Sequence, residues 1–209
     1  MATYIIVAVI AYLIGSINFS VILSKKLAGF DVREKGSGNA GTTNMLRSVG
    51  KKAAAITLVC DVLKGVVAVL IALIIGAIVQ SADKSLLVQI AGILVVVGHT
   101  FPIFFEFKGG KGVATSLGIL LISNWQIGLI CLVFALVLIA LTRMVSLGAV
   151  GAAVLFPVLT LFIHNHYLVT DGSGYLVYSI LLAIIVIFNH RENIQRILSG
   201  NENKISFKK

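Results

Sequence analysis

Residues Gly112 to Thr142 read GVATSLGILLISNWQIGLICLVFALVLIALT, and the way this stretch folds decides the architecture of the chain. A single helix of these 31 residues would extend about 46 Å, whereas the hydrocarbon core of a bilayer is about 30 Å thick. The polar segment SNWQ at 123–126 lies near the middle and offers a turn. The stretch therefore predicts two helices, over 113–123 and 125–142.

The chain as a whole has the composition of a membrane protein. Of its 209 residues, 58% are hydrophobic and only 12% are charged, whereas about a quarter of residues are charged in soluble domains. At about 20 residues per span, there is room for roughly six to eight spans and for almost nothing else. We therefore expect an all-α integral membrane protein with a single membrane-embedded domain over 1–209. The hydrophobic runs lie at 3–24, 53–79, 85–105, 113–123, 125–142, 145–163 and 175–189.

The distribution of basic residues predicts the number and the direction of the spans. With seven spans and the N-terminus outside, the segments 25–52, 106–112, 143–144 and 190–209 are cytoplasmic, and they contain fifteen of the seventeen Lys and Arg residues. One long helix over residues 112–142 would instead place the basic C-terminal segment outside. We therefore expect seven transmembrane helices and a cytoplasmic C-terminus. This orienting role explains the net charge of +9 without a nucleic-acid partner.

Two glycine-rich segments interrupt the apolar pattern on the cytoplasmic side. They are KGSGNAGTTN at 35–44 and KGGKGVAT at 108–115. Glycine lets backbone N–H groups approach an anion, and a helix N-terminus adds the positive end of its dipole. One such loop could be only a tight turn with orienting charges, but two in one chain favour a phosphate site. The second segment is not a nucleotide-binding P-loop, because Phe105 and Gly112 stand where that motif requires Gly and Ser or Thr.

Ionisable residues within the spans are interpreted as structural. Asp61 and Lys64 are three residues apart and share a helix face, so we expect them to pair. His99, near a helix end, is interpreted as a packing residue. Polar side chains in hydrocarbon need partners within the protein, so those of the first run should face protein and not lipid. They are Ser16, Asn18 and Ser20.

Two further polar clusters fall on the same side in this topology, TRMVSLG at 142–148 and NHRENIQRILSGNE at 189–202. The chain contains no GxSxG elbow, no HExxH motif and no usable His or Cys metal spacing. We therefore expect neither a metal nor a cofactor. Catalysis by such a chain would rest on positioning and charge stabilisation more than on a covalent nucleophile.

Taken together, the motifs resemble those of the bacterial acyl-phosphate:glycerol-3-phosphate acyltransferase family, which makes lysophosphatidic acid at the cytoplasmic membrane face. The matching segments are SGNAGTTN (37–44), FKGGKGVAT (107–115) and HRENIQRILSGNE (190–202), extended by GHTFP (98–102), DVLKG and RMVSLG. The resemblance implies transfer of a fatty acyl group from acyl phosphate to the 1-hydroxyl of glycerol 3-phosphate, with release of inorganic phosphate. It also implies that this first acylation of phospholipid biosynthesis takes place at the bacterial cytoplasmic membrane.

The resemblance further implies roles for individual residues. Lys111 and His190 would be catalytic: Lys111 would stabilise the developing charge while a substrate phosphate oxygen accepts the hydroxyl proton, and His190 is the alternative base. Ser37 and Arg47 would join Lys111 on the glycerol phosphate, and Asn193 would join His190 on the glycerol hydroxyls. The other implied substrate-binding residues are Asn39, Asn44 and, for the acyl phosphate, Thr43, Gly110, Gly112 and Ser146.

The implied partners are glycerol 3-phosphate, acyl phosphate, membrane lipid and a membrane-associated enzyme that produces acyl phosphate. A transporter of phosphorylated metabolites is the main alternative. Such a transporter would need polar residues at mid-membrane depth and access from both sides. The predicted outside loops are short and carry little chemistry, which favours the enzyme.

Overall fold

The computed structural model describes residues 1–80, 82–163 and 173–205, and in these ranges it contains helices and no strands. This confirms the all-helical class, and each of the seven hydrophobic runs lies on helices. Their bounds are α1 Ala2–Ser16, α2 Phe19–Ala28, η1 Val32–Glu34, α3 Thr42–Ser48, α4 Lys51–Ile78, α5 Lys84–Thr100, η2 Ile103–Phe105, α6 Val113–Ser123, α7 Trp125–Thr142, α8 Val145–Phe162, α9 Ser173–Asn189 and α10 Arg191–Leu198.

The chain forms two compact units that divide at the predicted turn. Unit 1 is Met1–Ser123 and unit 2 is Asn124–Lys209. The helix α6 ends at Ser123, and the side chain of Asn124 caps α7 by accepting the N–H of Ile127 at 3.2 Å. An N-cap of this kind satisfies a backbone donor that has no partner within the helix. The two helices predicted over 113–123 and 125–142 are therefore confirmed.

Helix length supports most of the expected spans. Among the described residues, five helical segments are long and apolar enough to cross a membrane, and six if α9 and α10, which are bent by 64°, form one span. The helix α6 has only 11 residues, so it is about 16 Å long, roughly half the thickness of the hydrocarbon core. The count of seven spans is thus not confirmed and stays a prediction.

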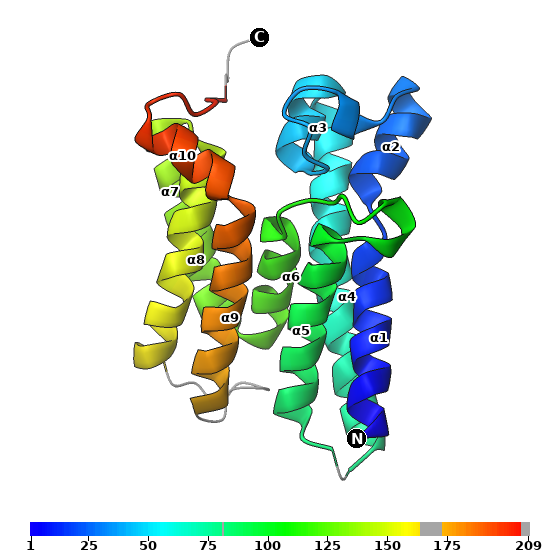
Figure 1. Ribbon diagram of the computed structural model, residues 1–209. Coiled ribbons are helices and arrows are strands. Elements are labelled where there is room, and N and C mark those ends of the chain that lie inside the picture. The colour runs from blue at the N-terminus through cyan, green and yellow to red at the C-terminus, as the bar shows by residue number, and fades with distance from the viewer. Residues whose placement is uncertain (81, 164–172, 206–209) are drawn as a thin grey trace. The chain divides into compact units, whose positions relative to one another are not determined.

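Close helix contacts form the framework of unit 1. The helix α1 packs along α5, and α4 packs along α6 (Figure 1). A Cβ atom on Gly15 of α1 or on Gly98 of α5 would collide with the backbone of the other helix, and the same holds for Gly65 of α4 and Gly118 of α6. Small residues at such positions let membrane helices approach closely.

The first hydrophobic run is broken between α1 and α2, and the break is repaired from α4. Asn18 caps α2 by accepting the N–H of Val21 at 3.2 Å. The ammonium of Lys64 donates to the carbonyls of Gly15 and Ile17, both at 3.0 Å. Carbonyls freed inside a membrane need such internal partners. As predicted, the polar residues of this run are buried: Ser16, Asn18 and Ser20.

Both glycine-rich segments lie at one end of unit 1. The helices α2 and α3 and the connection from α5 to α6 are at that end, whereas the N-terminus and the start of α5 are at the other (Figure 1). A small apolar core holds α2, α3 and α4 together there, formed by Val21, Val32, Ala40, Met45, Ala53 and Ala54. In unit 2, α8 contacts α7, α9 and α10.

Candidate active site

Loop 1, residues 35–41, is folded around the buried side chain of Asn44. The Asn44 amide donates to the carbonyls of Val32 and Lys35, both at 2.9 Å. Its oxygen accepts the N–H of Ser37 at 2.9 Å and the hydroxyl of Ser48 at 3.4 Å. A primary amide has two N–H donors and two lone pairs, and those of Asn44 are used by loop 1 and by the adjoining residues Val32 and Ser48. Asn44 therefore holds loop 1 in shape, and its expected contact with substrate stays a prediction.

The other predicted residues of this segment are at least partly exposed. Ser37 and Arg47 are exposed, and Asn39 and Thr43 are half-buried. Thr43 and Arg47 are four residues apart on α3, which places them on the same face of that short helix. Partly exposed residues with hydroxyl, amide and guanidinium groups thus lie on loop 1 and on α3, next to the anchor that Asn44 provides.

Loop 2, residues 106–112, folds back onto the end of α5 and touches loop 1. The N–H of Gly109 donates to the carbonyl of Thr100, and that of Gly110 donates to the carbonyl of His99, both at 3.0 Å. A Cβ atom on Gly110 would collide with the His99 ring and with the carbonyl oxygen of Ala40 in loop 1. Glycine is therefore required here for close approach, and the N–H of Gly110 is already used within the protein.

Lys111 lies where loop 2 enters α6. Gly112 is buried with a left-handed φ of 84°, and its carbonyl accepts the N–H of Ser116 at 2.8 Å in the first turn of the helix. The first N–H groups of a helix have no partner within it, and the dipole is positive at that end. Lys111 is half-buried directly before this helix start. A cationic side chain and a helix N-terminus therefore occur together, an arrangement suited to an anion.

A buried group of ionisable side chains lies beneath loop 2. The Lys64 ammonium is 3.2 Å from Asp61 Oδ1, and His99 Nδ1 is 3.6 Å from the same oxygen. All three side chains are no more than 4% exposed. The predicted pairing of Asp61 with Lys64 is confirmed, and the packing role of His99 stays a prediction, with its ring buried beside the same carboxylate. Because His99 also contacts Gly110, the group links the broken α1–α2 segment to loop 2.

In unit 2, the buried carboxylate of Glu202 gathers three side chains. Its Oε1 accepts from the Ser146 hydroxyl at 2.8 Å and from the Asn193 amide at 2.7 Å, and its Oε2 accepts from Arg196 at 2.9 Å. Burial opposes ionisation, but these three hydrogen bonds outweigh it and hold the pKa of Glu202 below its usual value. The structure thus brings together Ser146 and Asn193, and it adds Glu202, to which sequence reasoning gave no role.

Replacing Glu202 by Gln is expected to weaken the fold and its response to acid. The ionised carboxylate stabilises the folded state fully above its unfolded pKa of about 4.3, and this stabilisation is lost as pH falls through the lower folded pKa. In Glu202→Gln, the thermal midpoint of the detergent-purified protein should be lower at pH 7 and should fall less between pH 5 and pH 3. Glu192→Gln, at a carboxylate that is 70% exposed, is the control. An acid response equal to that of the wild type would contradict the role of Glu202.

His190 is held in one orientation at the bend between α9 and α10. It is 4% exposed, and its Nδ1 lies 2.8 Å from the carbonyl oxygen of Val186. A carbonyl can only accept, so the neutral ring carries its proton on Nδ1 and its lone pair on Nε2. The N–H of Ile194 donates to the His190 carbonyl at 2.8 Å, which ties the residue to the start of α10. An imidazole fixed in this way can accept a proton at Nε2.

The helices of spanning length place the chain in the class of helical integral membrane proteins. Comparison with known proteins gives the family. The sequence profile described as "Glycerol-3-phosphate acyltransferase" matches residues 5–200. A glycerol-3-phosphate acyltransferase of Clostridioides difficile (strain 630) is 46% identical over 99% of this chain and 98% of its own length. One from Neisseria meningitidis serogroup C is 41% identical over 94% of each chain.

Solved structures agree with the sequence comparison. The crystal structure of PlsY (YgiH), an integral membrane glycerol 3-phosphate acyltransferase, in its glycerol 3-phosphate form has a TM-score of 0.84 at 35% identity, covering 97% of this chain and 96% of that one. The lysophosphatidic acid form of the same enzyme has a TM-score of 0.82 at 33% identity, covering 97% and 95%. This chain therefore belongs to the glycerol-3-phosphate acyltransferase family, whose enzymes act in phospholipid biosynthesis.

Proposed function

We propose that the protein transfers a fatty acyl group from acyl phosphate to the 1-hydroxyl of glycerol 3-phosphate, giving lysophosphatidic acid and inorganic phosphate. The observation that carries the proposal is the contact of two glycine-rich loops at Gly110 and Ala40, since each substrate has a phosphate group to bind. Family membership supports the acceptor, because the related structures are named for glycerol 3-phosphate and lysophosphatidic acid forms. The resemblance of the motifs supports acyl phosphate as the donor.

The residues of unit 1 suit the phosphate groups. In this proposal, Ser37, Arg47 and Lys111 bind the glycerol phosphate with exposed or half-buried polar groups. Thr43 and the start of α6 hold the acyl phosphate, and Asn39 contributes a further amide. Because the N–H of Gly110 is donated to His99, the backbone donors are those of the first turn after Gly112. Gly110 contributes by letting the loops touch.

The residues of unit 2 are suited to bind the hydroxyls of glycerol 3-phosphate and the oxygen atoms of the acyl phosphate. His190 and Asn193 are proposed to bind the glycerol hydroxyls, and Ser146 the acyl phosphate. Support comes from Glu202, which fixes Ser146 and Asn193 at one carboxylate oxygen, and from the oriented ring of His190. Residues held in this way need little reorganisation when substrate binds.

The chemistry requires no covalent enzyme intermediate. The glycerol 1-hydroxyl attacks the carbonyl carbon of the acyl phosphate, a new C–O bond forms, and the bond from that carbon to the phosphate oxygen breaks. Phosphate is a good leaving group, so charge stabilisation by Lys111 suffices for its departure. The hydroxyl proton passes to a phosphate oxygen of the substrate or to Nε2 of His190.

Replacing His190 by Ala decides between these two proton acceptors. If His190 is the base, kcat should fall 100-fold or more, and the pH–rate profile should lose its pKa near neutrality. A profile of unchanged shape, with a smaller loss of rate, would assign the proton to the substrate phosphate. His190→Gln, which retains a polar side chain but cannot act as a base, separates hydroxyl binding from proton transfer.

Product stoichiometry tests the reaction itself. Purified protein would be supplied with labelled glycerol 3-phosphate and a long-chain acyl phosphate, and both products would be counted. We expect one labelled lysophosphatidic acid for each inorganic phosphate. Phosphate released without labelled lipid would indicate hydrolysis of the donor and would contradict the proposal.

We further propose seven spans in a single membrane domain, with the N-terminus outside and the active site at the cytoplasmic face of a bacterial inner membrane. The positions of the basic residues support this topology, because both glycine-rich loops lie at one end of unit 1 and Lys84 opens α5 at the other end (Figure 1). A single family profile matches residues 5–200, which supports one domain. A membrane-associated enzyme that makes acyl phosphate is the proposed partner, since the donor must be supplied at this face.

A further inference from the structure

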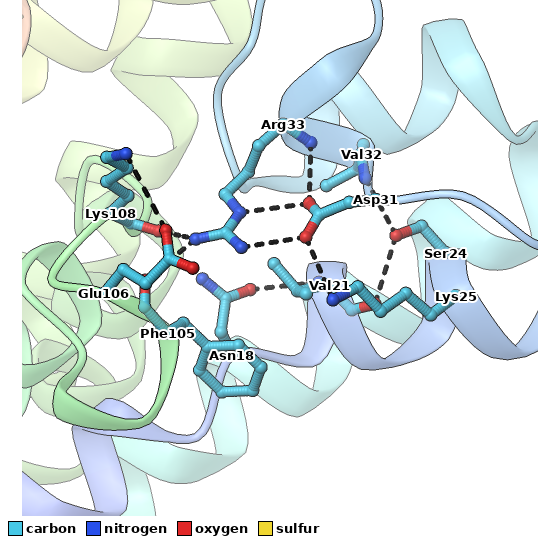
Figure 2. A network of polar contacts seen from close by, with 10 residues as sticks. All are labelled: Asn18, Val21, Ser24, Lys25, Asp31, Val32, Arg33, Phe105, Glu106 and Lys108. Carbon is cyan, nitrogen blue, oxygen red and sulfur yellow. Dashed lines mark hydrogen bonds and ion pairs between the residues drawn. The ribbon is translucent and has the colours of Figure 1, made fainter.

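A pair of oppositely charged side chains lies beside the two loops and outside the residues assigned above. Asp31 precedes η1 with a side chain 7% exposed, and Arg33 within η1 is 17% exposed. Two guanidinium nitrogens of Arg33 bind the two Asp31 oxygens at 3.0 and 2.8 Å, and the Lys25 ammonium is 3.3 Å from Oδ2 (Figure 2). A bidentate pair of this kind fixes the orientation of the guanidinium plane.

The remaining nitrogen of Arg33 reaches the start of loop 2. It donates to the carbonyl of Phe105 at 2.8 Å and lies 3.4 Å from the carbonyl of Lys108 (Figure 2). These partners are 72 and 75 residues away in sequence. The guanidinium thus bridges a carboxylate on one side and two backbone oxygens on the other. A lysine ammonium cannot reproduce this planar arrangement.

Arg33 also adjoins the anchor of loop 1. The carbonyl of its neighbour Val32 accepts from Asn44 at 2.9 Å. A Cβ atom on Gly38 would lie 3.5 Å from the carbonyl oxygen of Arg33. The short helix η1 therefore contacts loop 1 through its backbone and the start of loop 2 through the Arg33 side chain.

We propose that Arg33, oriented by Asp31, is a positioning residue that holds loop 2, and with it Lys111, in register with loop 1. Lys111 is three residues beyond Lys108, so a shift at the Arg33 contacts moves the proposed charge stabiliser. The three guanidinium nitrogens are occupied by protein atoms, which makes Arg33 a support of the site and not a substrate ligand. The kinetic part of this inference rests on the proposed acyltransferase function.

The ion pair between Asp31 and Arg33 is expected to persist at neutral and mildly acidic pH. The hydrogen bond from Arg33 is the largest cause that lowers the pKa of Asp31 to about 2. Asp31 is therefore ionised at neutral and mildly acidic pH. It follows that Asp31→Asn should lower the rate by a constant factor between pH 5 and pH 9, without a change in the shape of the profile.

Kinetics of variants test the positioning role. A displacement of about 1 Å can cost about 100-fold in rate, so Arg33→Gln should lower kcat by 10- to 100-fold. Arg33→Lys should recover little of this loss, because it restores charge but not the planar fork. The kcat of the double variant Asp31→Asn with Arg33→Gln should be no lower than that of Arg33→Gln alone.

Glu106→Gln is the control, at an exposed carboxylate of loop 2 that is 3.7 Å from Lys108, and its kcat should stay within twofold of the wild type. Near-wild-type activity in Arg33→Lys would overturn the proposal.

Hydrogen exchange tests the same claim without any assay of activity. In Arg33→Gln, the amides of Gly109 and Gly110 should exchange at least tenfold faster, whereas those in the middle of α5 should be unchanged. Unchanged exchange at Gly109 and Gly110 would refute the positioning role whatever the kinetics. A wild-type protein that transfers no acyl group would contradict the proposed function alone, and the exchange result would still decide the role of Arg33.

Discussion

Lys111→Ala is expected to lower kcat by about 100- to 1,000-fold while the protein still folds. The side chain is half-buried at the start of α6, where its charge adds to the positive end of the helix dipole. In the proposed reaction, the phosphate of the acyl donor and the glycerol phosphate both carry negative charge, and the charge on the donor phosphate grows as its bond to the acyl carbon breaks. Removing the ammonium should therefore affect the transition state more than the binding of either substrate.

The measurement is acyl transfer by the purified variant beside its thermal midpoint in detergent. Lys84→Ala, at an exposed lysine that opens α5, controls for the loss of one positive charge. Lys111→Arg should recover part of the rate, because it keeps the charge at a slightly different place. Wild-type turnover in Lys111→Ala would remove the centre of the proposed site.

Lys64→Met is expected to destabilise unit 1 severely. The change leaves Asp61 buried without its ammonium partner and with His99 3.6 Å away, and it removes the donor to the carbonyls of Gly15 and Ile17. Breaking a buried ion pair by removing one partner costs about 3–5 kcal/mol, which corresponds to a fall of about 10 °C in the thermal midpoint. Lys52→Met, on an exposed residue in the first turn of the same helix, is the matched control.

The double variant Asp61→Asn with Lys64→Met distinguishes two causes of this destabilisation, the unpaired carboxylate of Asp61 and the loss of the hydrogen bonds to the carbonyls of Gly15 and Ile17. If the unpaired carboxylate dominates the cost, the double variant should be more stable than Lys64→Met. If the two freed carbonyls dominate, the double variant should be no more stable. A midpoint for Lys64→Met within 2 °C of the wild type would contradict both explanations.

Local rules were sufficient for several features of the fold. The polar break at 123–126 marked the end of α6, because a 31-residue helix exceeds the bilayer and Asn124 is a good N-cap. The spacing of Asp61 and Lys64 predicted their pairing, because residues three apart share a helix face. Helix bounds followed less well from these rules, since the hydrophobic run 3–24 is divided between α1 and α2.

Features that depend on contacts distant in sequence were beyond such rules. Asn44 is expected to contact substrate because it stands in a polar motif, and only the fold shows that its amide also ties together Val32, Lys35 and Ser37. Glu202 stands alone at the end of a motif, and only the fold places it against Ser146, 56 residues away. Arg33 contacts Phe105 across 72 residues. In the sequence, such residues can be noticed only as charged or amide side chains near or within a polar motif. The sequence does not indicate which distant residue each of them contacts.

The measurement that tests the central claim most directly is a comparison of acyl donors. Purified wild-type protein would receive labelled glycerol 3-phosphate together with acyl phosphate, acyl-CoA or acyl carrier protein, each in a separate reaction and with the same acyl chain. We expect labelled lysophosphatidic acid from acyl phosphate and none above background from the other two donors. Product from acyl-CoA alone would keep the enzyme class but overturn the donor, and no product from acyl phosphate would contradict the account.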